Sequence, residues 1–392
     1  MNKHIIYVTD MNMGGADSSA QAVTRSGYSN IGIELSNGIV ANGNEVKILG
    51  LGYTGQEHRS PFSIIPCASL QDVAGCINNM KILWGIDAVI VALDIHHFQE
   101  QIFPTVQKLE IPYICITPLE SDPLCPSWAN LLSQMDKVFF ISQFGTDEAK
   151  KAGVDAEHIE IGIDTAAWRL RTEEEYKNVR STMGFSDDDF VIISVADNQE
   201  RKNISGGFQA IAKLKEQGVS VKHILVTREN SMVGWKLYDL AYLEDINLSS
   251  EIRVFQSGMP FKDLYSLYCA ADVYLSCSKG EGLGLPIMEA MSVGVPVVAN
   301  KTGALPELLA DGRGWLADYK FWHYDPFGNQ RRYFIDVDKA AEKMMEIRDL
   351  QKKGSIDYIT SLANARQYME SRGWAKSAQQ IEDAVEGLKS EA

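Results

Sequence analysis

The sequence has no apolar run long enough to cross a bilayer. Among its 392 residues, no stretch approaches the roughly 20 apolar residues that a spanning helix needs. The chain enters a strand-like segment at once, from His4 to Thr9, and no charged and apolar leader precedes it. From these absences we expect neither a signal peptide nor a transmembrane segment, and a cytoplasmic location.

Positive charge is scarce. The sequence has 37 Lys and Arg residues against 52 Asp and Glu residues, which gives a formal net charge of −15. A large non-specific nucleic-acid surface needs clustered cations. The overall charge therefore argues against such a surface, although it allows a local basic groove.

Paired cysteines are also lacking, because none of the six cysteines forms a C-x-x-C motif. Most of them lie in apolar segments, where a thiol behaves as a small core residue. This usage indicates a reducing compartment. The six are Cys67, Cys76, Cys115, Cys125, Cys269 and Cys277.

The length predicts two domains, because a single hydrophobic core stops growing at roughly 250–300 residues. Apolar strands alternate with helices throughout, which is typical of α/β domains with parallel, doubly wound sheets. In the first half we expect strands at 4–10, 45–49, 62–65, 87–93, 113–117, 138–142 and 159–162, and helices at 31–41, 70–84, 98–109, 127–135 and 145–152. In the second half we expect strands at 190–196, 223–227, 252–256, 273–275 and 295–299, helices at 205–216, 261–270, 287–293, 338–351, 356–371 and 376–389, and a hairpin or flap at 319–333.

A glycine-rich turn follows the apolar segment 273–275. It contains Gly280, Gly282 and Gly284, and Pro286 stands where a helix can begin, because its missing N–H is unpaired there anyway. The helix ends before Gly294. A strand, a glycine turn and a helix N-terminus together make an anion site, since free backbone N–H groups and the helix dipole point at the ligand.

Two carboxylates flank this turn, Glu281 inside it and Glu289 in the helix. A carboxylate is a poor phosphate ligand but a good acceptor for sugar hydroxyls. The combination suits a molecule with a diphosphate in the middle and a sugar at each end. On spacing alone, a structural turn with solvated glutamates is an equally good interpretation.

The stretch 278–291 resembles the E-x7-E signature of retaining glycosyltransferases with the GT-B fold, most closely family GT4, the glycosyl transferases group 1. It reads Ser-Lys-Gly-Glu-Gly-Leu-Gly-Leu-Pro-Ile-Met-Glu-Ala-Met. Further family positions match at Pro296, Gly303, Glu307 and Gly314. The resemblance implies two Rossmann-like doubly wound domains facing a central cleft. It also implies that Glu281 contacts the donor sugar and Glu289 holds the nucleotide ribose, while backbone amides reach the donor sugar and phosphate; these amides belong to Gly282, Leu283, Gly284 and Leu285.

Two cations stand ahead of the predicted helix 205–216. Arg201 and Lys202 lie at the carboxyl end of a strand, where they suit a diphosphate. Such a pair more commonly consists of two surface charges. The resemblance gives Lys202, and with it Arg201, a role in binding the donor diphosphate. The family often carries an arginine several residues before the lysine, and this chain has Asp197 there.

In the first domain, the resemblance places a glycine loop near the donor phosphates, with Gly27 as the best match and Gly14-Gly15 as the competitor. It also implies an active-site histidine after the strand 87–93, where His96 and His97 follow one another. We favour His97 slightly. Glu120, in a segment resembling a GT4 subgroup, is a candidate ligand for an acceptor hydroxyl, and its alternative is a solvated loop acid.

The resemblance also sets domain limits. We expect an acceptor-side domain at 1–166, a donor-binding domain at 167–373 and a last helix at 374–392 that crosses back to the first domain. The boundary lies at Asp164, and the charged residues 169–180 begin the link into the second domain. The loop with Met259 and Pro260 faces the nucleotide base in the family.

The implied reaction moves a sugar from a UDP- or GDP-sugar to an acceptor hydroxyl with retained configuration, in a hexosyltransferase. No D-x-D pair is placed at the site, so we expect no metal and a front-face substitution. The acceptor is open between a glycan, a lipid-linked sugar, a small molecule and a modified nucleic acid, and so is the oligomeric state. The alternatives are a non-catalytic nucleotide-sugar binding protein and a GT-B phosphorylase, epimerase or hydrolase.

Overall fold

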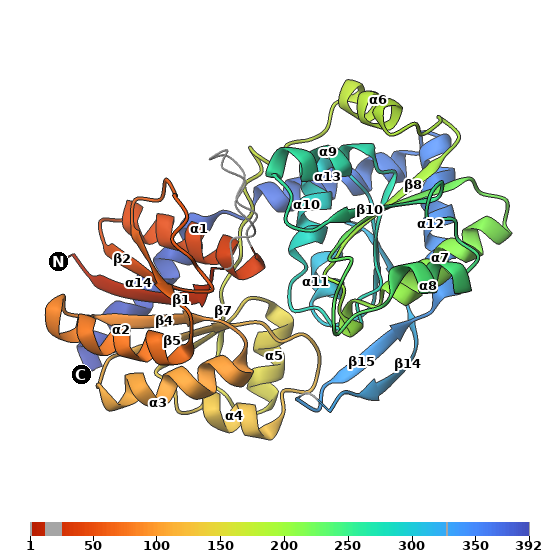
Figure 1. Cartoon of the computed structure of the whole chain (residues 1–392). Coiled ribbons are helices and arrows are strands. Elements are labelled where there is room, and N and C mark those ends of the chain that lie inside the picture. Colours follow the sequence, from red (N-terminus) through yellow and green to blue (C-terminus); the bar gives the residue numbers. More distant parts are fainter. Residues whose placement is uncertain (1, 12–25, 327, 392) are drawn as a thin grey trace. The chain divides into compact units, whose positions relative to one another are not determined.

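The structure, a computed structural model, describes residues 2–11, 26–326 and 328–391. The chain divides into two compact units. Unit 1 comprises Met1–Gly162, Phe327–Asn329 and Arg372–Ala392, and unit 2 comprises Ile163–Pro326 and Gln330–Ser371. Each unit is built around one parallel sheet covered by helices (Figure 1).

Unit 1 contains a seven-stranded sheet in the order β3-β2-β1-β4-β5-β6-β7, with all neighbours parallel. Its central strands are buried along their length, as expected of a sheet covered on both faces. The strands are β1 (His4–Asp10), β2 (Glu45–Leu51), β3 (Ser63–Cys67), β4 (Ala88–Ala92), β5 (Tyr113–Thr117), β6 (Lys137–Phe140) and β7 (Glu157–His158). The helices are α1 (Gly27–Ala41), α2 (Leu70–Leu83), α3 (Glu100–Lys108), α4 (Pro126–Leu132), α5 (Gln143–Lys151) and α14 (Trp374–Glu391), with a π-helical turn at Ile95–Gln99.

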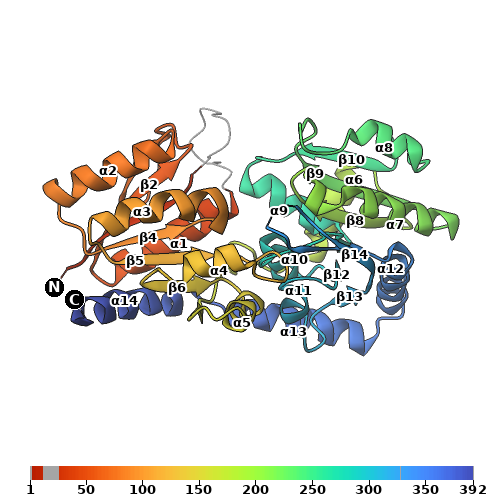
Figure 2. The same cartoon turned by 90° about the horizontal axis from the view of Figure 1, so that it is seen from below.

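The last helix, α14, packs on α1 and belongs to unit 1 (Figure 2). A side chain at Gly38 of α1 would come within 2.7 Å of the Ala378 Cβ, so the close approach of the two helices requires glycine there. Two polar contacts fix the end of α14: Lys3 Nζ donates to Glu386 at 2.8 Å, and Asn44 donates to Glu382 at 2.9 Å.

Unit 2 contains a six-stranded parallel sheet in the order β10-β9-β8-β11-β12-β13. The strands are β8 (Phe190–Val195), β9 (Val221–Thr227), β10 (Ile252–Gln256), β11 (Val273–Ser276), β12 (Val297–Asn300) and β13 (Trp315–Ala317). A separate antiparallel hairpin, β14 (Tyr319–Tyr324) and β15 (Arg331–Ile335), stands beside the sheet (Figure 1). The helices are α6 (Glu173–Thr182), α7 (Ile204–Glu216), α8 (Leu237–Leu243), α9 (Phe261–Ala270), α10 (Leu285–Val293), α11 (Leu305–Leu308), α12 (Val337–Lys352) and α13 (Ile356–Glu370), with a 3-10 turn at Glu200–Lys202.

The predicted α/β alternation and the hairpin at 319–333 are confirmed, but the strand predicted at 159–162 is wrong. The Ile159 N–H still bonds to the Phe140 carbonyl, after which the chain leaves the sheet. The Ile161 carbonyl instead accepts from Arg372 Nε at 3.0 Å. A side chain at Gly162 would come within about 3.1 Å of Arg372 and Trp374, so the C-terminal segment fills the place of a further strand.

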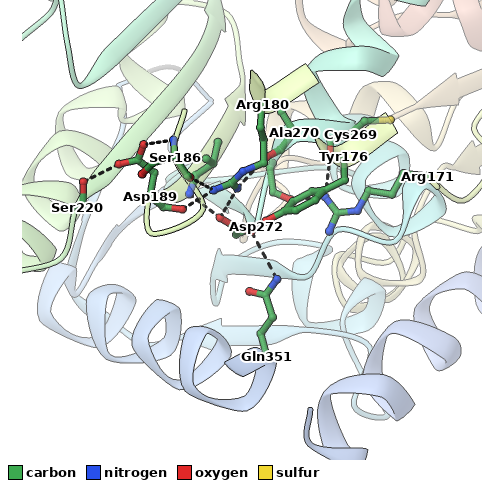
Figure 3. Close-up of polar contacts among 12 residues, drawn as sticks. Arg171, Tyr176, Arg180, Ser186, Asp189, Ser220, Cys269, Ala270, Asp272 and Gln351 are labelled. Atoms are coloured by element: carbon green, nitrogen blue, oxygen red, sulfur yellow. Dashed lines mark hydrogen bonds and ion pairs between the residues drawn. The ribbon is translucent and has the colours of Figure 1, made fainter. Parts of the chain in front are cut away.

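The segment 169–180 is more than the charged link expected from the sequence, because α6 occupies most of it. Thr172 caps the helix in a capping box with Glu175. The far end is anchored by Arg180, whose side chain is 4% exposed and whose Nη1 donates to Asp272 Oδ2 at 2.9 Å. Figure 3 shows Tyr176 and Gln351 pointing at the same carboxylate.

This anchor spans several elements of unit 2. Arg180 Nη2 also donates to the carbonyls of Ser186 and Asp189, and Asp272 Oδ2 accepts from the Val191 N–H at 2.7 Å (Figure 3). A buried charge pair is costly to break, since removing one partner leaves an uncompensated charge.

We therefore expect Arg180→Met to lower the free energy of unfolding by about 3–5 kcal/mol. The matched control is Lys177→Met on the same helix, whose exposed pair with Glu173 is worth at most about 1 kcal/mol. Urea unfolding followed by circular dichroism measures both. Equal losses in the two variants would contradict the anchoring role of Arg180.

Candidate functional site

The candidate site in unit 2 lies where the strand order reverses. The chain runs outward from β8 through β9 to β10 and returns to β11 on the other side of β8. Ligands of doubly wound sheets bind at such a switch point, outside the carboxyl ends of the strands. A pocket of about 480 Å³, part of which is open to solvent, lies here and is lined by the ends of β8 and β11 and the first turns of α7 and α10.

The glycine turn forms one wall of the site. Gly284 has φ 94° and caps α10, a left-handed conformation that favours glycine, and Pro286 follows in the first turn. Gly282, Leu283 and Gly284 are buried. Within the part of the chain that the structure describes, the N–H groups of Gly282 to Leu285 have no acceptor. Buried donors without a partner are rare, and here they point to an anion as the missing acceptor.

A charge cluster is centred on Glu281 of the same turn. Glu281 Oε2 accepts from Lys202 Nζ at 2.7 Å and from Ser278 Oγ at 3.0 Å, and Arg201 Nη1 lies 3.6 Å away. Arg201 Nη1 also donates to the Gly280 carbonyl at 2.7 Å. The structure thus brings together three residues that the sequence singled out separately.

The cluster keeps Glu281 ionised. Burial alone would raise the pKa of its carboxyl, but the charges of Lys202 and Arg201 outweigh burial and hold the pKa below its usual range. The hydrogen bonds from Lys202 and Ser278 act in the same direction.

Glu289 has the opposite environment. Burial within α10 raises the pKa of its carboxyl to about 7, and a hydrogen bond from the Tyr268 hydroxyl at 2.8 Å opposes this only in part. The two glutamates therefore differ electrostatically, since Glu281 stays charged whereas Glu289 titrates near neutral pH.

Asp197 has a partner that the sequence did not reveal. Its carboxylate accepts two hydrogen bonds from the Arg228 guanidinium, at 2.5 and 2.6 Å. Arg228 directly follows β9, and its position at the end of an apolar strand was the only signal for it in the sequence.

Two further residues were missed. The Lys279 side chain is 3% exposed, pairs with Glu200 and lies 4.0 Å from the Phe334 ring centroid, which ties the hairpin strand β15 to the glycine turn. His223 lines the pocket, and burial lowers its pKa to about 3. Its Nε2 lies 3.1 Å from Ser194 Oγ. Sequence patterns mark neither, because both depend on tertiary burial.

The remaining predicted residues of unit 2 are peripheral to this pocket. Met259 and Pro260 lie between β10 and α9, where Pro260 precedes the first residue of the helix, and neither lines the pocket.

In unit 1 the strand order reverses between β1 and β4. Gly27 begins α1 just after the capping residue Ser26, and the competing pair Gly14-Gly15 lies outside the described residues. The Tyr28 hydroxyl donates to Asp94, which follows β4, and Ser29 Oγ donates to the Asp10 carbonyl at 2.9 Å.

The histidine pair lies in the π-helical turn Ile95–Gln99. The His96 ring stacks on Trp128 of α4 with centroids 5.9 Å apart. The side chain of His97, which the sequence favoured, is outside what the structure describes. Glu120 lies in the partly buried loop between β5 and α4.

The described residues contain no group of three or more His, Cys, Asp or Glu side chains that suits a metal ion. The same residues contain no helix of the length and apolarity that crossing a membrane requires.

Comparison with known proteins identifies the domain that carries the pocket. Residues 176–346 match the family model described as glycosyl transferases group 1. The chain carries a glycosyl transferases group 1 domain. This range includes the glycine turn, the charge cluster and Glu289, so the resemblance to glycosyl transferases group 1 is confirmed for these residues.

Curated relatives are similar in sequence to parts of this chain. A GDP-mannose-dependent monoacylated alpha-(1-6)-phosphatidylinositol monomannoside mannosyltransferase of Corynebacterium glutamicum is 24% identical over 55% of this chain and 54% of its own length. A D-inositol 3-phosphate glycosyltransferase of Corynebacterium urealyticum is 32% identical over 40% of this chain and 37% of its own length. The chain thus spans about half the length, or less, of the curated relatives it matches.

Solved structures match the whole chain. Sucrose-phosphate synthase from Thermosynechococcus elongatus is 15% identical, with a TM-score of 0.77 over 100% of both chains. HepE of Anabaena in complex with UDP-glucose is 17% identical, with a TM-score of 0.70 over 98% of this chain and 99% of its own. The chain has the GT-B fold, as the resemblance implied.

The raised pKa of Glu289 predicts a pH-dependent stability. Its folded pKa of about 7 lies above that of an exposed glutamate, so the folded protein binds the proton more tightly than the unfolded chain. The stability that the protonated side chain contributes is full at low pH and is lost as the pH rises through about 7.

Glu289→Gln cannot ionise and keeps an acceptor for Tyr268. We expect this variant to gain stability relative to the unchanged protein by up to about 3 kcal/mol between about pH 4 and pH 8. Urea unfolding at a series of pH values measures the difference. A stability difference that does not vary with pH would refute the burial of an ionisable carboxyl at this position.

Proposed function

We propose that the chain is a hexosyltransferase that moves a sugar from a nucleoside diphosphate sugar to an acceptor hydroxyl, with retention of configuration. The observation that carries this proposal is the pocket at the switch point of the group 1 domain. Lys202, Glu281 and Gly284 line it. Next to them in the chain are Arg201, the helix residue Glu289, and N–H groups of the glycine turn for which the described residues offer no acceptor.

The diphosphate of the donor would occupy the anion site. The backbone of the turn fixes the amides of Gly282 to Leu285, and Glu281 holds the side chains of Lys202 and Arg201 next to this turn. When the bond from the sugar to the diphosphate breaks, the leaving group gains negative charge. Preorganised donors aimed at developing charge are commonly the largest catalytic contribution, and we propose that these cations make a divalent metal unnecessary.

The two glutamates would recognise the hydroxyl groups at either end of the donor. Glu281 accepts hydrogen bonds from the sugar, and Glu289 accepts them from the ribose. In the structure, the Glu281 carboxylate pairs with Lys202 and Arg201. A bound diphosphate would compete for these two cations and leave the Glu281 carboxylate available to the sugar.

Retention would follow from a front-face substitution. The bond between the anomeric carbon and the phosphate oxygen breaks, the acceptor oxygen forms its bond on the same face, and the acceptor proton passes to the leaving phosphate. A retaining glycosidase instead needs a carboxylate nucleophile. Glu281 is held by two cations and Glu289 by Tyr268, so neither glutamate is arranged as one.

The base, the sugar and the acceptor stay open within this proposal. HepE of Anabaena was solved with UDP-glucose, and the Corynebacterium glutamicum relative is named for GDP-mannose, so UDP- and GDP-sugars are the donors to test. A glycan, a lipid-linked sugar, a small molecule and a modified nucleic acid are the acceptor classes to test. All six cysteines are free and five are buried, which supports a reducing compartment such as the cytoplasm.

Glu281→Gln should change donor binding and transfer in opposite directions. Removing the carboxylate charge frees Lys202 and Arg201, so the affinity for UDP or GDP alone should rise several-fold, as measured by isothermal titration calorimetry. The rate of transfer should fall, because the sugar loses its charged acceptor. A lower nucleotide affinity in this variant would contradict the competition between Glu281 and the diphosphate.

Lys202→Ala and Glu289→Ala test the proposed function directly. We expect each to lower kcat/KM for transfer by roughly 100-fold, the usual effect of removing one preorganised contact. Lys213→Ala, on the exposed side of α7, is the matched control and should leave the rate unchanged. The assay measures nucleotide release from UDP- and GDP-sugars with and without an acceptor panel.

The same assay separates the alternatives. Donor consumption that needs no acceptor would indicate a hydrolase or epimerase. Nucleotide binding without any turnover would indicate a binding protein. Undiminished transfer in both Lys202→Ala and Glu289→Ala would remove the donor-site assignment.

A further inference from the structure

A second guanidinium, that of Arg228, lies in a loop beside the one that contributes Ala196 and Lys202 to the unit 2 pocket. Arg228 is the first residue after β9, and Asp197 lies two residues after β8. These strands are parallel neighbours, so their carboxyl ends lie side by side. Arg228 Nε donates to Asp197 Oδ1 at 2.5 Å, and Nη2 donates to Oδ2 at 2.6 Å.

The guanidinium is held in one orientation. Asp197 is itself fixed by a hydrogen bond from Gln199 Nε2 at 2.6 Å. The loops after the two strands are also joined, because Asn198 accepts from the Trp235 N–H and donates to the Trp235 carbonyl, both at 2.8 Å. A planar fork that is oriented beforehand loses little conformational freedom when it binds a ligand.

Arg228 keeps donors available for a ligand. A guanidinium has five N–H donors, and Asp197 accepts two hydrogen bonds from it. The side chain is 49% exposed, and no acceptor for Nη1 occurs among the residues that the structure describes. Since a bidentate fork matches a phosphate, the remaining donors suit an anion.

The loop that positions Arg228 is the one that carries Lys202. Ala196, directly before Asp197, lines the pocket. The Gln199 N–H donates to the Asp197 carbonyl at 2.8 Å, and the Lys202 N–H donates to the Gln199 carbonyl at 3.0 Å. The Arg228 guanidinium is therefore linked, through a few short contacts, to the pocket edge where Lys202 pairs with Glu281.

We propose that Arg228, oriented by Asp197, binds a phosphate oxygen of the nucleoside diphosphate in this pocket. The inference rests on the proposed function and adds to it a binding residue from a neighbouring strand. Lys202 and Arg201 share the charge of Glu281. Arg228, which pairs with Asp197, supplies N–H donors that do not depend on displacing Glu281.

The test compares Arg228→Ala, Arg228→Lys and Arg253→Ala with the unchanged protein. Arg253 is a matched control, because it is an exposed arginine inside β10 whose side chain donates to the Ser249 carbonyl. Calorimetry measures UDP and GDP, ligand-observed NMR measures uridine and guanosine, and thermal unfolding checks the fold. For the nucleotide that binds, we expect a 10- to 100-fold loss of affinity in Arg228→Ala, a smaller loss in Arg228→Lys and none in Arg253→Ala, with nucleoside binding unchanged.

Other outcomes would contradict the proposed role of Arg228 in phosphate binding. If Arg228→Ala binds the diphosphate as tightly as the unchanged protein, Arg228 is no ligand and the proposed donor site stands without it. An equal loss for nucleoside and nucleotide would mean that Arg228 only tethers the loops. If Arg228→Ala does not fold, unimpaired diphosphate binding by Arg228→Lys overturns the inference. If the unchanged protein binds neither UDP nor GDP, the proposed function itself fails.

Discussion

The fold of unit 2 at its switch point depends on one charge cluster, in which the Glu281 carboxylate is shared by Lys202 and Arg201. The cluster joins the loop after β8 to the glycine turn after β11, and the Lys279 N–H reinforces the junction by donating to the Arg201 carbonyl. Because these loops lie at neighbouring strand ends, the same contact that closes the fold gathers positive charge beside free backbone N–H groups.

The surrounding structure gives two similar side chains different chemistry. Cations keep Glu281 charged, whereas burial in α10 lets Glu289 titrate near pH 7. Groups whose environments separate their pKa values in this way are commonly found at functional sites. The buried pair Arg180–Asp272 supports the same sheet from its other end, since Asp272 immediately precedes β11.

The sequence predicted those features that depend on local pattern. Apolar runs predicted the strands. The glycine turn and the resemblance predicted that Glu281, Lys202 and Glu289 lie after or between strands. The pairing of Lys202 with Glu281 did not follow, because the two residues are 79 positions apart and meet only through sheet order. For the same reason Arg228 beside Asp197, the buried Lys279 and the end of the strand at Gly162 were not predicted.

We propose that this pocket binds the diphosphate of a nucleotide sugar by drawing Lys202 away from Glu281. A crystal structure of the chain with bound UDP or GDP tests this binding mode most directly. We expect phosphate oxygens on Lys202 Nζ and on the amides of the glycine turn, with the ribose on Glu289. A nucleotide bound elsewhere, or a phosphate that leaves the contact between Lys202 and Glu281 unchanged, would contradict it.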